Sequence, residues 1–198
     1  MSKKPSPKKS KKAPRSRSPA RLPGDPTRAQ MIERMIRVDQ AGEYGAVRIY
    51  EGQLSVLGES ASAPVIEHMA EQERRHLDAF NKLIPERRVR PTALLPFWHV
   101  AGFALGAGTA MLGEKAAMAC TVAVEEVIEE HYAGQVERLK AEGIEKKLRD
   151  TFEEFRLEEA EHKQTSLDHG ARDTPGYEVL TGLIKAGSRL AIWLSTRV

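Results

Sequence analysis

The sequence has one cysteine, Cys120, so no disulfide bond can form within the chain, and a reducing compartment is expected. It has no run of alternating apolar and polar residues bounded by turn signals, which argues against β-strands. It lacks a Gly-rich dinucleotide-binding motif, which argues against a dedicated dinucleotide-binding fold. The N-terminus lacks the apolar core of a secretory signal. What remains is a chain of 198 residues, long enough for one domain with its own core.

Positive charge is concentrated near the N-terminus. Residues 1–30 hold ten of the 31 Lys and Arg residues and one acid, Asp25, so they carry about +9 while residues 31–198 carry about −6. Residues 1–26 are rich in Lys, Arg, Ser and Pro, which predicts a disordered tail ahead of a folded domain at 27–198. We expect no nucleic-acid partner for that domain. For the tail, contact with anionic lipid or with nothing specific, organelle targeting, and docking to nucleic acid or protein remain open.

After Pro26 the apolar residues recur with the period of amphipathic helices, which predicts an all-α fold. The predicted helices lie at about 27–57, 62–84, 113–142, 145–170 and 176–195. Residues that break helices lie at or near these ends, namely Pro64, Pro85, Gly143 and Pro175. Such residues belong at helix ends, because proline and glycine disfavour helix interiors.

Glutamate and histidine recur in a fixed order along four of these helices. A glutamate on an apolar helix face is followed, in the next helix, by a Glu-x-x-His pattern, and the same order then repeats. At this spacing the Glu and His side chains leave the same helix face, and both pairs lie on apolar stripes. The six residues are Glu43, Glu73, His76, Glu125, Glu159 and His162.

A buried carboxylate without a partner is costly, so four of them need a common explanation. Two divalent cations would balance their charge, with glutamates bridging the metals and one histidine in a terminal position on each. Carboxylate and imidazole suit iron or manganese better than zinc or copper. The ordered pattern resembles the ligand set of ferritin-like di-iron bundles. We therefore interpret the six residues as ligands of two iron ions in a ferritin-like four-helix bundle.

Some residues near these positions allow more than one interpretation. Gly42 and Gly45, which flank Glu43, either leave room for dioxygen or a flat ring or let two helices approach closely. Each costs roughly 1 kcal/mol relative to alanine in a helix interior, so a specific reason for them is expected.

Four polar residues are also left open by the sequence. Glu129 is either an alternative ligand or a solvated side chain. Asp39, one turn before Glu43, could orient a ligand histidine, as outer carboxylates do in metal sites. His131 and Tyr132 either line a substrate or proton path or have an ordinary structural or surface role.

Residues 91–112, PTALLPFWHVAGFALGAGTAML, contain no charged side chain and are long enough to be considered for a membrane span. Pro96, His99 and several glycines weaken that interpretation. One crossing would also place the two halves of the metal site on opposite sides of the membrane. We therefore expect added apolar helices that lie at a membrane interface or dip in and return, with a buried helix pair as the alternative. The apolar helix at 176–195 is expected to pack with this segment or rest on lipid.

Three stretches resemble the demethoxyubiquinone hydroxylases of ubiquinone biosynthesis: RVDQAGEYGAVRIYEGQL, VRPTALLPFWHVAGFALGAGTAMLGEKAAMACTVAVEE and FRLEEAEH. The resemblance runs from about Arg28 to the C-terminus and includes the apolar insert. The family's ligand positions fall on the six residues given above. Its His-Tyr pair, implicated in electron or substrate handling, matches His131 and Tyr132. The basic tail lies outside the resemblance.

The resemblance implies a di-iron monooxygenase that uses O2 to hydroxylate the ring of a polyprenylated demethoxybenzoquinol, a late step of ubiquinone biosynthesis. Electrons are expected from NADH, relayed through the quinone without a dedicated NADH-binding fold. The alternatives are a di-iron oxygenase acting on another lipid and a ferritin-like protein that oxidises or stores iron. The charge-free segment at 91–112 argues against a protein that oxidises or stores iron.

A membrane surface is the expected location, because the substrate is very apolar. The Lys-rich, Pro-interrupted tail favours the cytoplasmic face of a bacterial inner membrane, with the matrix face of a mitochondrial inner membrane as the alternative. Binding to other ubiquinone-biosynthesis proteins and assembly into a homo-oligomer are left open.

Overall fold

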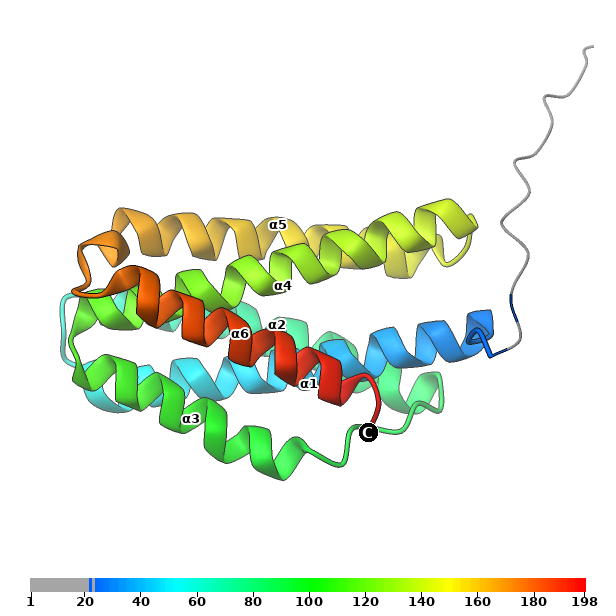
Figure 1. Cartoon of the computed structure of the whole chain (residues 1–198), viewed down its shortest axis with the longest axis horizontal. Coiled ribbons are helices and arrows are strands. Elements are labelled where there is room, and N and C mark those ends of the chain that lie inside the picture. The colour runs from blue at the N-terminus through cyan, green and yellow to red at the C-terminus, as the bar shows by residue number, and fades with distance from the viewer. Residues whose placement is uncertain (1–21, 23) are drawn as a thin grey trace, which may run out of the picture.

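The computed structural model describes residues 22 and 24–198, and their regular structure is entirely helical (Figure 1). In chain order the elements are α1 (Arg28–Leu57), α2 (Ala63–Glu86), α3 (Leu95–Met111), α4 (Glu114–Glu142), α5 (Lys146–Asp168), the 3-10 helix η1 (Ala171–Asp173) and α6 (Tyr177–Ser195). The predicted all-α class is confirmed, and the ends of the five predicted helices lie within two residues of those observed. The predicted tail at 1–26 lies almost entirely outside the described residues.

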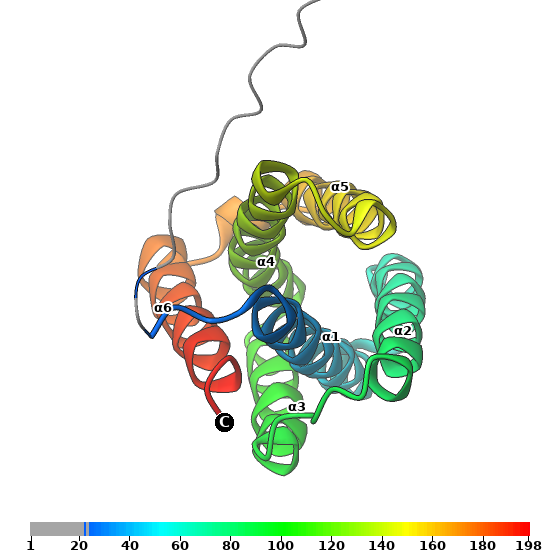
Figure 2. The ribbon, with the colours of Figure 1, turned by 90° about the vertical axis from the view of Figure 1, so that its right-hand side faces the viewer.

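Helices α1, α2, α4 and α5 surround a common centre, as Figure 2 shows in an end-on view. Helix α3 packs on the outer side of α1, and α6 packs along the outer side of α4. This is the predicted ferritin-like four-helix bundle with two added helices. Helices α1 and α4 therefore lie between the bundle centre and an outer layer formed by α3 and α6.

Local sequence signals set the ends of the bundle helices. Thr27 and Gln30 form a capping box at the start of α1, in which each side chain bonds the other residue's backbone N–H. At the end of α4, Gly143 has a φ of 65°, a left-handed conformation that glycine adopts without strain. The Gly143 and Ile144 N–H groups then bond to the last carbonyls of α4. The resulting short turn brings α5 back antiparallel to α4.

Residues 95–111 form one helix, α3, rather than a buried pair. It contacts α1 through glycines, since a Cβ at Gly106 would lie 1.9 Å from the Ile49 carbonyl oxygen. The opposite face is open, with Phe97 62% and Val100 65% exposed. Among residues 22 and 24–198, no helix combines the length and apolar character that a membrane crossing requires.

Candidate metal centre and adjoining pocket

The six predicted ligand residues converge at the centre of the bundle. They come from all four bundle helices: Glu43 from α1, Glu73 and His76 from α2, Glu125 from α4, and Glu159 and His162 from α5. Every one of these side chains is buried, although the sequence places them up to 119 positions apart. The apolar stripes on which they lie explain this, because each stripe turns its helix toward the shared core.

These residues form two overlapping groups, each able to hold a metal ion. Within each group, one potential ligand atom from every residue lies within 4.8 Å of the others. The first group comprises Glu43, Glu73, His76 and Glu159, and the second comprises Glu73, Glu125, Glu159 and His162. Glu73 and Glu159 belong to both groups, as expected of glutamates that bridge two ions.

Both histidines turn Nδ1 toward the predicted ligand glutamates and Nε2 away from these glutamates. His76 Nδ1 lies 3.2 Å from Glu159 Oε1 and 3.4 Å from Glu43 Oε2. His162 Nδ1 lies 3.1 Å from Glu73 Oε1 and 3.3 Å from Glu159 Oε2. A histidine that binds a metal through Nδ1 must carry its proton on Nε2, so Nε2 is left to donate outward.

The residues present fit a pair of cations. Among the described residues, eight buried side-chain atoms of the six predicted ligands have no hydrogen-bond partner: Glu43 Oε2, both oxygens of Glu73 and Glu159, Glu125 Oε2, and Nδ1 of His76 and His162. Buried polar atoms are normally satisfied, and unsatisfied ones carry a free-energy penalty. Cations at the centre would satisfy all of these atoms together.

The electrostatics of the cluster also favour positive charge. Burial raises the pKa of Glu73 well above its usual value, and the neighbouring charge of Glu159 raises it further. Burial is likewise the largest cause of the raised pKa of Glu125 and of Glu159. Burial lowers the pKa of His76, but the nearby carboxylates of Glu159 and Glu43 outweigh it and raise the pKa to about 12. The cluster therefore gains from bound protons or metal ions.

Two buried tyrosines orient the glutamates that belong to one group only. The Tyr50 hydroxyl of α1 donates to Glu125 Oε1 at 2.7 Å, and the Tyr132 hydroxyl of α4 donates to Glu43 Oε1. Each tyrosine reaches from one of these helices to the glutamate of the other. In each case the remaining oxygen, Oε2, is left facing the centre without a partner.

The predicted role of Asp39 is wrong. Its carboxylate lies 3.1 Å from His131 Nε2 and accepts a 2.8 Å hydrogen bond from Gln135, and it contacts neither predicted ligand histidine. Desolvation raises the pKa of Asp39 to about 6, although the hydrogen bond to His131 lowers it. Asp39 and His131 form a polar pair beside Glu43, and the His131 side chain is partly exposed.

Glu129 lies outside the cluster. It forms ion pairs with Lys163 and, at 3.5 Å, with Arg156. Glu129 is thus a partly buried, ion-paired residue, and it belongs to neither of the two groups that could hold a metal ion.

The sequence interpretation missed the outward partners of the two histidines. His76 Nε2 hydrogen-bonds Glu158, and His162 Nε2 lies 3.0 Å from Gln72 Oε1. Each partner directly precedes a Glu-x-x-His pattern. In the sequence, each looks like an ordinary exposed polar residue. Their shared place before the pattern is the signal that could have identified them.

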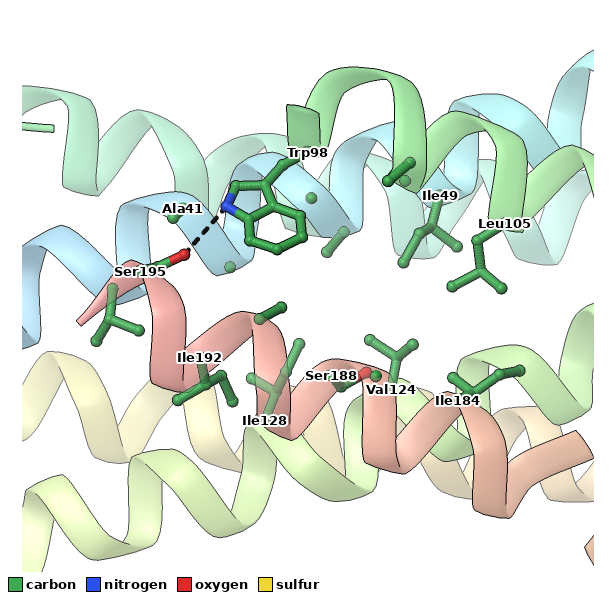
Figure 3. A pocket seen from close by; sticks show the side chains of 18 of the residues that line it. Ala41, Ile49, Trp98, Leu105, Val124, Ile128, Ile184, Ser188, Ile192 and Ser195 are labelled. Carbon is green, nitrogen blue, oxygen red and sulfur yellow. Dashed lines mark hydrogen bonds between the residues drawn. The ribbon is translucent and has the colours of Figure 1, made fainter. Parts of the chain in front are cut away.

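An apolar pocket of about 490 Å³ lies between α1, α3, α4 and α6 (Figure 3). Gly42 and Gly45 line it, and a Cβ at either position would meet nothing within 4 Å. The missing side chains of Gly42 and Gly45 thus leave room in the pocket, whereas the close approach of α3 to α1 at the Gly45 carbonyl depends on the missing side chain of Gly102. At one end of the pocket, Trp98 of α3 donates a 3.0 Å hydrogen bond to Ser195 of α6, as Figure 3 shows.

Comparison with known proteins gives one consistent group of relatives. A family model described as "Ubiquinone biosynthesis protein COQ7" matches residues 30–195. The chain is 59% identical over 179 residues to the 3-demethoxyubiquinol 3-hydroxylase of Rhodospirillum rubrum, covering 90% of this chain and 84% of the relative. It is 54% identical over 169 residues to the NADPH-dependent 3-demethoxyubiquinone 3-hydroxylase, mitochondrial, of Homo sapiens, covering 84% of this chain and 78% of that relative.

Proposed function

The chain belongs to the COQ7 family of ubiquinone biosynthesis proteins, and we propose that it is a 3-demethoxyubiquinol 3-hydroxylase, a monooxygenase. In this reaction O2 gives one oxygen atom to a ring C–H bond of the quinol, which becomes C–OH. The second oxygen atom leaves as water after taking up two electrons and two protons. The observation that carries the proposal is the convergence of six buried carboxylate and imidazole residues beside an apolar pocket.

Two iron ions are the proposed cofactors, and each would be held by one of the two overlapping groups. Glu43 and His76 would belong to one ion and Glu125 and His162 to the other, while Glu73 and Glu159 would bridge them. The hard oxygen and imidazole donors suit iron. When bound, the iron pair supplies the activation of O2 that the ring hydroxylation requires.

The apolar pocket is the proposed binding site for the quinol ring and the first part of its prenyl chain. Its volume lies within the usual range for small-molecule sites. Gly42 and Val124 line the pocket, and each is the direct neighbour of a predicted ligand, Glu43 or Glu125. The substrate would therefore lie against the two helices whose other faces carry the metal centre. The apolar walls would exclude water from the reacting ring.

His131 and Tyr132 are proposed to handle protons near Glu43. Tyr132 is buried and donates a hydrogen bond from its hydroxyl to Glu43, while His131 is partly exposed and hydrogen-bonded to Asp39. This arrangement supports a route by which protons reach the centre from solvent. The resemblance to a family His-Tyr pair supports the same role.

The source of electrons is proposed to be a reduced nicotinamide coenzyme. The sequence prediction was NADH, whereas the mouse and human relatives are named NADPH-dependent. Both reductants therefore belong in any activity assay.

A lipid surface is the proposed location of the protein. Large apolar side chains are exposed along α3 and α6: Phe97, Val100, Val179, Leu183, Leu190 and Trp193. These helices also form two walls of the pocket, so a substrate with a long prenyl chain would pass from lipid into the site. The relatives include bacterial and mitochondrial proteins, so the bacterial inner membrane and its mitochondrial alternative both stay predictions.

The substitution Glu159→Ala tests the proposed centre. Glu159 belongs to both metal groups, so its loss is expected to abolish quinol hydroxylation and to lower bound iron well below two per chain. Glu161→Ala is the matched control, because Glu161 lies two residues away on the exposed face of α5. Iron analysis and product formation would be measured on both variants. Full turnover by Glu159→Ala would contradict the assignment.

A further inference from the structure

The bundle contains an internal two-fold pattern. Tyr50 follows Glu43 by seven positions on α1, and Tyr132 follows Glu125 by seven positions on α4. Each tyrosine donates a hydrogen bond to the glutamate of the other helix, Tyr50 to Glu125 and Tyr132 to Glu43. The α1–α2 half and the α4–α5 half therefore present equivalent groups to the centre.

Each histidine likewise bonds a residue of the other half, but the two accepting residues differ chemically. Gln72, directly before Glu73, accepts from His162 of the other half. Glu158, directly before Glu159, accepts from His76 of the other half. Gln72 and Glu158 occupy equivalent positions, but one offers a neutral amide oxygen and the other a carboxylate.

The carboxylate of Glu158 also has a second partner. Arg75 Nη2 lies 3.0 Å from both oxygens of Glu158, beside the hydrogen bond from His76. A carboxylate accepts a stronger, charge-assisted hydrogen bond than an amide does. It thereby increases the electron density on the opposite ring nitrogen, Nδ1, and makes the histidine a better metal ligand.

We propose that Glu158 and Gln72 are positioning residues that make the two metal positions unequal, so that the ion at Glu43 and His76 is bound more tightly than the ion at Glu125 and His162. This inference rests on the di-iron centre of the proposed function. The difference in affinity is expected to be about 10-fold to 100-fold, the usual effect of a partner that orients a ligand histidine. The chain then fills one position before the other.

Asp39 and His131 add a second difference between the halves, because they lie beside Glu43 while the equivalent positions of the other half hold Thr121 and Ile49. A test must therefore change the histidine partners and leave this pair intact. Two reciprocal substitutions do so. Glu158→Gln gives both histidines an amide partner, and Gln72→Glu gives both a carboxylate.

The experiment titrates the metal-free full-length protein with ferrous iron under anaerobic conditions and records Mössbauer spectra with 57Fe. The wild type is expected to bind iron in two resolved steps, with one quadrupole doublet filling before a second. Glu158→Gln should weaken the tighter step about 10-fold or more and bring the doublets together. Gln72→Glu should strengthen the weaker step. Glu154→Gln, at an exposed position one turn earlier on α5, is the control that should match the wild type.

Equal binding steps with a single doublet in the wild type would overturn the inference. Unchanged binding and spectra in both reciprocal variants would also overturn it. If Glu158→Gln does not fold, Gln72→Glu decides alone, because it adds a carboxylate without removing one. A wild type that binds no iron would instead overturn the di-iron centre of the proposed function. Unequal sites in a protein that hydroxylates no quinol would sustain the inference and contradict the function.

Discussion

At the residue scale, Glu43 and its neighbours place polar and apolar chemistry on different faces of one helix. Successive residues of an α-helix point about 100° apart, so Gly42 and Gly45 face away from the direction of the Glu43 side chain. The carboxylate turns to the bundle centre, and the two glycines open toward the pocket. A side chain introduced at Gly45 would thus enter the pocket without contacting the predicted ligands.

The substitution Gly45→Leu separates substrate binding from metal binding. Its Cβ meets nothing within 4 Å, so the fold and the bound iron should be kept. The leucine should occupy pocket volume and lower kcat/KM for the quinol by about 10-fold or more, a barrier increase of roughly 1.4 kcal/mol. Steady-state kinetics with iron analysis would test this.

Gly134→Leu provides the matched control, because Gly134 lies on an exposed face of α4 where a Cβ also meets nothing. It should leave kcat/KM unchanged. Equal kcat/KM values in the two variants would show that the quinol does not bind in this pocket.

The sequence allowed the six inward residues to be predicted, because order and helical period reveal which side chains face a core. It did not allow the outward partners to be predicted. Glu158 and Gln72 each contact a histidine on another helix, and one sequence contains no record of how helices pair in space. The partner of Asp39 was not predictable for the same reason, since it is His131 on α4 rather than a predicted ligand histidine.

At the element scale, glycines determine how closely α3 approaches α1. A Cβ at Gly106 would lie 1.9 Å from the Ile49 carbonyl oxygen, and a Cβ at Gly102 would lie 2.8 Å from the Gly45 carbonyl oxygen. Backbone atoms cannot move aside as flexible side chains do. The two helices therefore fit together only while these positions stay glycine.

Gly106→Ala should destabilise the protein by about 1–3 kcal/mol, the usual cost of overpacking. Gly108→Ala, two residues later on the same helix, should be neutral or stabilise by up to roughly 1 kcal/mol, because its Cβ meets nothing and alanine favours helices. Chemical denaturation of both variants measures the difference. An equally stable Gly106→Ala would contradict the close approach of α3 and α1.

The helix ends were predictable because capping residues and prolines mark them locally. The place of α3 was not. A charge-free segment can face lipid, a core or both, and only the packing decides which side is covered. In the structure one face of α3 lies on α1 while Phe97 and Val100 stay exposed.

At the scale of the whole molecule, the polar bundle and the apolar outer helices lie in separate layers. Helix α6 is tied to α4 by ion pairs from Lys185 to Glu126 and from Arg189 to Glu130. Its other face exposes Leu183, Leu190 and Trp193. This layer is the surface expected to meet lipid.

Leu190→Glu should weaken binding to phospholipid vesicles by about 10-fold or more, because burying a leucine contributes about 1.5–3 kcal/mol. Leu157→Glu on α5 is the control, since Leu157 is 55% exposed and Leu190 is 56% exposed. Flotation is measured at high salt, because salt screens electrostatic attraction between exposed charges and anionic lipid and leaves the apolar contribution. Equal loss of binding in both variants would show that α6 is not the lipid-binding surface.

The mass of the product shows whether the protein hydroxylates the quinol ring. The protein would be loaded with ferrous iron and given a short-chain demethoxyubiquinol, NADH or NADPH, and 18O-labelled O2. The expected product is a quinol whose ring carries one labelled oxygen atom. An unmodified quinol after incubation of protein with two irons bound per chain would contradict it, as would an incorporated oxygen without label.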